Sequence, residues 1–157
     1  MAIQIGQPAP DFTLRDTDKN PVTLSEQRGK TVLLLFFPLA FTSVCTKELC
    51  SVRDNIAFYS NMNATVYGIS VDSMFSLKKF KEEQNLNFSL LSDFNKSASA
   101  AYGALYEHFF NDMDGVSKRS AFVIDREGVV RYAEVLENAG DVPDFEAIQH
   151  CINSINH

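Results

Sequence analysis

The sequence predicts an α/β domain with a mixed central sheet, and the order of two kinds of segment leads to this prediction. Two unbroken runs of β-branched and apolar residues, TVLLLFF (31–37) and TVYGISV (65–71), have the pattern of parallel strands covered on both faces. A helical segment lies between them at about 43–62, and another follows at 73–84. Strand, helix, strand and helix in succession is typical of an α/β fold.

The segments at the two ends add antiparallel strands to this sheet. FTLRD (12–16) and PVTLSE (21–26) flank the turn-like sequence DKNP, so we expect an N-terminal hairpin. RSAFVID (119–125) and VVRYAEV (129–135) flank a tight turn, which indicates a second antiparallel pair.

Three shorter predictions complete the fold. FSLLSD (88–93) is a short extended segment, and a helix follows it at about 96–103. A last helix opens at 141–143 and runs to about residue 156. The sum is a thioredoxin-like arrangement, with a mixed sheet, helices on both faces and an N-terminal hairpin.

Length and composition favour one domain that covers residues 1–157. The chain has no repeat, low-complexity tract or linker, and a chain of 157 residues buries roughly 70% of its unfolded surface. The net charge of −6, with only 14 scattered Lys and Arg, argues against a nucleic-acid surface. The N-terminus lacks the features of a signal peptide, and the longest apolar run is too short to cross a membrane core of about 30 Å. We therefore expect a cytoplasmic protein.

The cysteines and histidines point to free thiols and to no bound cofactor. The chain has three cysteines, at positions 45, 50 and 151, which is a poor disulfide framework and favours free, reactive thiols. The histidines at 108, 150 and 157 show no spacing that converges on the cysteine pair. We therefore expect neither a metal nor haem.

Cys45 follows the first buried strand, at the edge of the sheet where open α/β folds bind their ligands. If Thr42 is the N-cap, Cys45 lies in the first helical turn, where unpaired N–H groups favour an anion. An ordinary cysteine is only a few per cent thiolate at pH 7, and a helix end contributes only about 0.3–2 kcal/mol. A nucleophilic Cys45 therefore also needs a fixed cation. Arg119, at the start of a later buried strand, is the best-placed candidate.

Less specific interpretations of both residues stay open at this point. A lone cysteine is more often a small buried apolar side chain than a nucleophile, so Cys45 could be part of the core. Arg119 could simply place a charge at a strand end, as the neighbouring Lys118 does.

The segment PLAFTSVC (38–45) has the Pro-x-x-x-Thr-x-x-Cys pattern and resembles the peroxiredoxins. The similarity covers essentially the whole chain, from GQPAPDFTL through FSLLSD to the RxxFVID strand. PLAFT and FSLLSDF resemble the alkyl hydroperoxide reductase E subgroup. A second cysteine five residues after Cys45 resembles the bacterioferritin-comigratory (Q-type) subgroup instead.

This resemblance implies a thiol peroxidase in which the Cys45 thiolate attacks a peroxide oxygen and becomes a sulfenic acid. It implies that Thr42 and Arg119 bind the peroxide, that Pro38 shields the sulfenic acid and forms the floor of the substrate pocket, and that Glu48 orients an arginine. For Glu48, an exposed acid in the first helical turn is the alternative. Thioredoxin, glutaredoxin or a low-molecular-weight thiol would serve as the reductant.

The resemblance also implies a homodimer that forms through the surface around the active site. The segments 42–46 and 94–102, or the loop that holds Phe109, Phe110 and Met113, would contribute to it. These three side chains could equally border the substrate pocket.

Cys50 is the candidate resolving cysteine. Positions five apart in an ideal helix place their Cα atoms about 8.6 Å apart, whereas a disulfide needs less than about 7 Å. A Cys45–Cys50 disulfide therefore requires the helix to unwind.

Three alternatives to this resolution stay open. Cys50 could be a buried helix residue, with an external thiol resolving Cys45. Cys151 is expected in the core and is a minor candidate for resolving Cys45 or for an intermolecular disulfide. A dithiol–disulfide oxidoreductase is a second reading, although four residues separate Cys45 from Cys50 where such enzymes have two. A third is a non-enzymatic module, either a copper-binding protein or a holdase.

Overall fold

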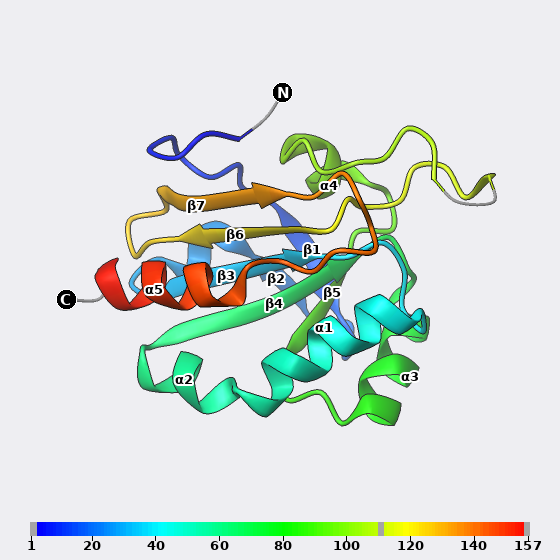
Figure 1. The fold of residues 1–157 in the computed structure, drawn as a ribbon, viewed down its shortest axis with the longest axis horizontal. Helices are drawn as coiled ribbons and strands as arrows, with labels where there is room; N and C mark the ends of the chain where they lie inside the picture. Colours follow the sequence, from blue (N-terminus) through cyan, green and yellow to red (C-terminus); the bar gives the residue numbers. More distant parts are fainter. Residues whose placement is uncertain (1–2, 110–111, 156–157) are drawn as a thin grey trace.

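The computed structural model describes residues 3–109 and 112–155, and within them a seven-stranded sheet runs in the order β2-β1-β5-β4-β3-β6-β7 (Figure 1). The strands are β1 (Thr13–Asp16), β2 (Pro21–Thr23), β3 (Thr31–Phe36), β4 (Ala64–Ser70), β5 (Ser89–Ser92), β6 (Ser120–Ile124) and β7 (Val130–Val135). The central strands β3, β4 and β5 are parallel, as the two apolar runs predict. The pairs β1–β2 and β6–β7 are antiparallel, so the N-terminal hairpin and the mixed sheet are confirmed.

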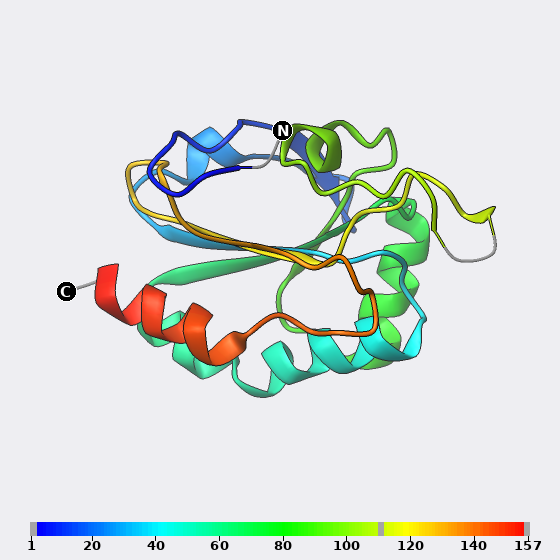
Figure 2. The same cartoon turned by 45° about the horizontal axis from the view of Figure 1, so that its top comes forward.

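Helices cover both faces of this sheet, as Figure 2 shows. They are η1 (Leu24–Gln27), α1 (Ser43–Asp54), α2 (Ile56–Asn61), α3 (Met74–Gln84), α4 (Ser97–Ala101) and α5 (Phe145–Ile155). Buried side chains of α1, α2, α3 and α5 pack with Leu33 and Leu35 on one face. Side chains of η1 and α4 pack with Leu34 and Phe36 on the other. Successive residues of β3 thus supply two cores, because side chains alternate between the faces of a strand.

Three predicted helices have other bounds in the structure. The helix expected at about 96–103 is the shorter α4, Ser97–Ala101. Polar side chains explain the other two differences. The segment 43–62 forms two helices, α1 and α2, which are divided at Asn55. The side-chain amide of Asn55 donates to the Ser51 carbonyl (2.9 Å) and so competes with the helical backbone hydrogen bond to that carbonyl. The last helix begins at Phe145 rather than at 143, because the Asp144 carboxylate accepts the Ala147 N–H (3.1 Å) as an N-cap. Its predicted end at 156 lies outside the described residues.

The expected second strand of the N-terminal hairpin is also shorter than the run 21–26. After Thr23 the chain turns into η1, which buries Leu24 in the core with β3.

In the described part of the chain, each helix is too short or too polar to traverse a lipid bilayer.

Candidate active site

Thr42 is the N-cap of α1, as predicted, but its side chain does not cap the helix. The Thr42 hydroxyl donates backwards to the Leu39 carbonyl (2.9 Å), and the first helical bond runs from the Thr46 N–H to the Thr42 carbonyl (3.0 Å). The N–H groups of residues 43–45 therefore precede the first bond of the helical ladder and carry the positive end of the helix. Cys45 lies in this turn and is fully buried.

The Arg119 guanidinium joins two other buried side chains of the site, those of Cys45 and Glu48. The Arg119 Nη2 atom donates to the Cys45 sulfur at 3.3 Å, and its Nη1 atom donates to the Glu48 Oε1 atom at 2.6 Å. Arg119 is 2% exposed and Glu48 is 1% exposed. The structure therefore brings together Cys45 and Glu48 of α1 and Arg119, the residue before β6. Each of the three is a candidate site residue in the sequence.

A backbone carbonyl fixes the other side of the same guanidinium. The Ala139 carbonyl accepts hydrogen bonds from Arg119 Nε (3.2 Å) and Nη2 (3.0 Å). Ala139 belongs to the segment that leaves β7 and returns to α5, drawn in orange in Figure 1. The Tyr106 hydroxyl donates to the Leu136 (3.3 Å) and Glu137 (3.1 Å) carbonyls of this segment and so fastens it.

Burial sets the charge balance of this cluster. Burial raises the pKa of Glu48 from its ordinary value of 4.5 to about 7, and the Arg119 charge offsets only part of that rise. For Arg119, burial acts against the charge, but Glu48 and Cys45 outweigh it and raise the pKa of the guanidinium. The Cys45 thiol and the Glu48 carboxyl thus share the Arg119 charge. When Glu48 is protonated, the Arg119 charge acts mainly on the Cys45 sulfur.

Contacts with Asp72 and Phe80 hold the loop that leads into α1. Pro38 is buried, and the Ala40 N–H donates to the Asp72 carboxylate (2.8 Å), which the Ser70 hydroxyl also contacts (2.7 Å). Phe41 has a positive φ of 68°, and its ring packs edge-on against Phe80 at 5.2 Å between centroids. A non-glycine residue in this conformation carries strain, so the bond to Asp72 helps to hold the loop in place.

The other two cysteines have separate partners and are free thiols. Cys50, on α1, donates to the Gln84 Oε1 atom on α3 at 3.6 Å. Cys151, on α5, donates to the Arg131 carbonyl at 3.7 Å, and burial raises the pKa of its thiol.

The loop between α4 and β6 holds three apolar residues that the sequence singled out, Phe109, Phe110 and Met113. Phe109 packs on Tyr106 at 5.1 Å between centroids, Met113 is 41% exposed, and Phe110 lies outside the described residues. His108 is exposed beside Asp114. Over residues 3–109 and 112–155, no three His, Cys, Asp or Glu side chains are grouped as a metal ion would require.

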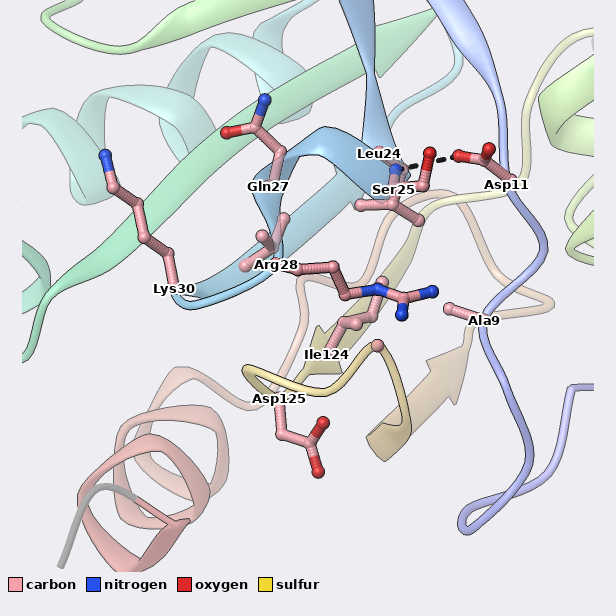
Figure 3. A pocket seen from close by; sticks show the side chains of 11 residues that line it. Ala9, Asp11, Leu24, Ser25, Gln27, Arg28, Lys30, Ile124 and Asp125 are labelled. Carbon is pink, nitrogen blue, oxygen red and sulfur yellow. Dashed lines mark hydrogen bonds between the residues drawn. The ribbon is translucent and has the colours of Figure 1, made fainter.

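A small hollow lies at the other end of β3, where the strand begins (Figure 3). The Arg28 side chain reaches over Gly128, where a Cβ atom would lie 2.5 Å from the Arg28 Nε atom. Partial desolvation acts to raise the pKa of Asp11, but hydrogen bonds from the Ser25 N–H (2.8 Å) and the Phe12 N–H (2.9 Å) outweigh it, so the pKa is lowered. The hollow measures about 10 Å³, which is close to the space of one water molecule, so it is not a ligand site.

Comparisons with known proteins show which family this chain belongs to. The family model described as the AhpC/TSA family matches residues 5–133. Alkyl hydroperoxide reductase E of Mycobacterium tuberculosis (strain H37Rv) is 41% identical over 145 residues, which are 90% of this chain and 91% of that protein. Peroxiredoxin Bcp of Bacillus subtilis (strain 168) is 38% identical over 130 residues, 82% of each chain. The crystal structure of peroxidoxin BcpB from M. tuberculosis has a TM-score of 0.85 at 29% identity and covers 98% of both chains. This neighbour confirms the thioredoxin-like fold predicted from the sequence.

Proposed function

We propose that Cys45 is the reacting cysteine of this chain, which belongs to the AhpC/TSA family and is a thiol-dependent peroxidase. The observation that carries the proposal is the 3.3 Å contact between the Arg119 guanidinium and the buried Cys45 sulfur in the first turn of α1. A cation and a helix N-terminus both favour the thiolate, which is the nucleophilic form of cysteine. Among the described residues, no other cysteine lies in the first turn of a helix.

The first step consumes one peroxide. The thiolate attacks a peroxide oxygen, a sulfur–oxygen bond forms as the oxygen–oxygen bond breaks, and the leaving oxygen takes a proton to become water or an alcohol. Cys45 is oxidised to a sulfenic acid and the peroxide is reduced. The Arg119 donors beside the sulfur suit the charge that develops on the leaving oxygen.

Three neighbouring residues support this step in the proposal. The Thr42 hydroxyl donates to the Leu39 carbonyl, so its lone pairs can accept a hydrogen bond from the peroxide. Pro38 has no N–H group and shields the sulfur within the buried loop. The ion pair of Glu48 with Arg119 orients the guanidinium.

Cys50 resolves the sulfenic acid in the second step. The Cys50 sulfur attacks the Cys45 sulfur, a disulfide forms as the sulfur–oxygen bond breaks, and the hydroxide leaves with the thiol proton as water. Both thiols lie in the regular helix α1, so the helix opens before they meet. A cellular thiol then reduces the disulfide, and we propose thioredoxin or glutaredoxin for this role. Direct resolution by an external thiol is the alternative.

We also propose a homodimer that forms through the surface around the site. Phe41, beside Thr42, is 51% exposed, and Phe94, at the start of the segment 94–102, is 63% exposed. Large exposed apolar side chains close to a site are typical of association surfaces. A cytoplasmic location and a single domain over residues 1–157 remain predictions of the sequence.

Peroxide consumption with thioredoxin or dithiothreitol tests the proposal. We expect Cys45→Ser to abolish turnover and Cys151→Ser, the matched control, to keep it. Cys50→Ser should lose turnover with thioredoxin, whereas dithiothreitol can still resolve the sulfenic acid. Full activity of Cys45→Ser would refute the nucleophile. Full thioredoxin-dependent activity of Cys50→Ser would show that an external thiol resolves Cys45.

A further inference from the structure

We infer that Gln84 and Asn87 are positioning residues that hold Cys50 within the intact helix α1 and thereby slow formation of the Cys45–Cys50 disulfide. Gln84 is the last residue of α3, and Asn87 lies in the turn that follows it. The inference rests on the proposed function, because it takes Cys50 as the resolving cysteine.

Three hydrogen bonds join the C-terminal half of α1 to this one stretch of chain. The Cys50 sulfur donates to the Gln84 Oε1 atom at 3.6 Å, and Arg53 Nη1 donates to the Gln84 carbonyl at 2.5 Å. The Asn87 side-chain amide donates to the Arg53 carbonyl at 3.2 Å. The contacts therefore hold the Cys50 and Arg53 side chains of α1 and also its backbone at Arg53.

The two ends of α1 are held by different parts of the protein. Arg119 binds Cys45 and Glu48 in the first turns of α1. Gln84 and Asn87 bind the later turns of the same helix. Because the Arg119 guanidinium holds Cys45 in place, the later turns of α1 must move to bring Cys50 to Cys45. The sulfur must then leave the Gln84 side chain, and the Asn87 bond to the helix backbone must break as the turns unwind.

The strength of this attachment determines how long the sulfenic acid persists. A sulfenic acid that waits can react with a second peroxide, which adds an oxygen to the sulfur and leaves as water or an alcohol, to give a sulfinic acid. A looser attachment should therefore speed the disulfide and reduce this overoxidation of Cys45.

The test separates the two chemical steps in the full-length reduced protein. Samples mixed with one equivalent of hydrogen peroxide are quenched with a thiol-alkylating reagent at set times, and mass spectrometry counts sulfenic acid and disulfide. A hydrogen bond is worth about 1 kcal/mol, so we expect Gln84→Leu and Asn87→Ala each to speed disulfide formation about fivefold. Formation of the sulfenic acid should stay at the wild-type rate in both variants.

Two further variants distinguish positioning from a general disturbance of α3. Gln84→Glu keeps an acceptor for the Cys50 thiol, so it should keep the slow wild-type rate. Glu83→Ala removes only a 3.8 Å pair with the exposed Lys79 on the same helix, and it should change neither step. At ten equivalents of peroxide, Gln84→Leu should accumulate less sulfinic acid than wild type.

The possible failures are distinguishable. If wild type forms the disulfide and both Gln84→Leu and Asn87→Ala form it no faster, the inference is wrong while Cys50 remains the resolving cysteine. If wild type forms a sulfenic acid but no Cys45–Cys50 disulfide, the proposed role of Cys50 fails and the inference fails with it. Equal acceleration in Glu83→Ala would also overturn it. Asn87→Ala replaces an exposed side chain and keeps the test valid if Gln84→Leu does not fold.

Discussion

Arg119 carries a permanent charge that contacts both acidic groups of the site, the Cys45 thiol and the Glu48 carboxyl. We expect Arg119→Met to slow the reaction of Cys45 with hydrogen peroxide by about 10²–10³, the usual cost of losing one donor to a developing charge. The rate is measured from single-turnover sulfenic acid formation, after far-UV circular dichroism has shown that the variant is folded.

Arg15→Met provides the matched control for that variant. Arg15 lies on β1 and binds the Lys19 carbonyl, so its loss should leave the rate unchanged. A rate within threefold of wild type in Arg119→Met would remove the guanidinium from the mechanism.

Glu48 makes the stability of the protein depend on pH. Burial raises the pKa of its carboxyl from 4.5 to about 7 in the folded protein. Between these values the folded state keeps a proton that the unfolded chain has lost, so stability falls as pH rises and the loss is complete above about 7. Glu48→Gln has no such proton, and between pH 5 and 8 it should lose less stability than wild type, by on the order of 2 kcal/mol. Urea unfolding at both pH values measures the difference.

The exposed residue Glu127 gives the control for this experiment. Glu127→Gln should follow the wild-type pH dependence, because this side chain lies at the surface of the folded protein. If Glu48→Gln also follows it, Glu48 is charged throughout this range in the folded protein.

The sequence predicted the side chains of the site better than the groups that hold them. Cys45, Thr42 and Arg119 were identified because the motif and the strand ends mark them. Asp72 follows the strand at 65–71 and had the same kind of signal, since polar residues at strand ends face the site. The contact of the Ala139 carbonyl could not be predicted from the sequence, because every residue has a backbone carbonyl and the residue type does not reveal what it binds.

At the level of elements, α1 must exist in two conformations if Cys45 and Cys50 join. In the reduced protein, α1 is a continuous helix that buries Leu49 and Val52 in the core. We expect oxidation by one equivalent of peroxide to lower amide protection in 43–54 by at least tenfold, because the unwound turns lose their helical bonds. Hydrogen exchange followed by mass spectrometry measures this change, with α5 (Phe145–Ile155) as the internal reference.

Cys50→Ser should keep this protection after the same treatment, since no disulfide can form at that position. Unchanged protection in oxidised wild type would mean that α1 stays closed and that Cys50 does not pair with Cys45. Cleavage by trypsin after Lys47, which is exposed, gives an independent readout of the same opening.

Periodicity predicted the strands and most helices, and local polar contacts explain where it failed. The runs at 31–37 and 65–71 are apolar on both faces, which leaves little choice but a central parallel pair. The break at Asn55 depends on one side-chain bond to Ser51. Such competition between a side chain and the backbone leaves the hydrophobic pattern unchanged, so the pattern could not reveal it.

The whole molecule is organised around β3, because neighbouring residues of this strand belong to different cores. Leu33 packs with α1 and α5 on one face, and Leu34 packs with η1 and α4 on the other, both without exposed surface. A strand that feeds two cores couples them mechanically, since neither can lose its packing without disturbing the shared backbone. This coupling supports the prediction that residues 1–157 form one domain.

We therefore predict that the protein unfolds in a single transition and that Leu33→Ala and Leu34→Ala both lower the urea concentration at its midpoint. Each removes a fully buried leucine side chain, so each should reduce the free energy of unfolding by about 2–5 kcal/mol. Urea unfolding is followed by far-UV circular dichroism and by tyrosine fluorescence, which the five tyrosines and the lack of tryptophan make suitable. The two signals should change together in both variants, as two-state unfolding requires. Ile5→Ala, at a position 63% exposed, should leave the midpoint nearly unchanged. If each leucine variant shifted a different one of two separate transitions, the faces of the sheet would be independent units and the one-domain prediction would be wrong.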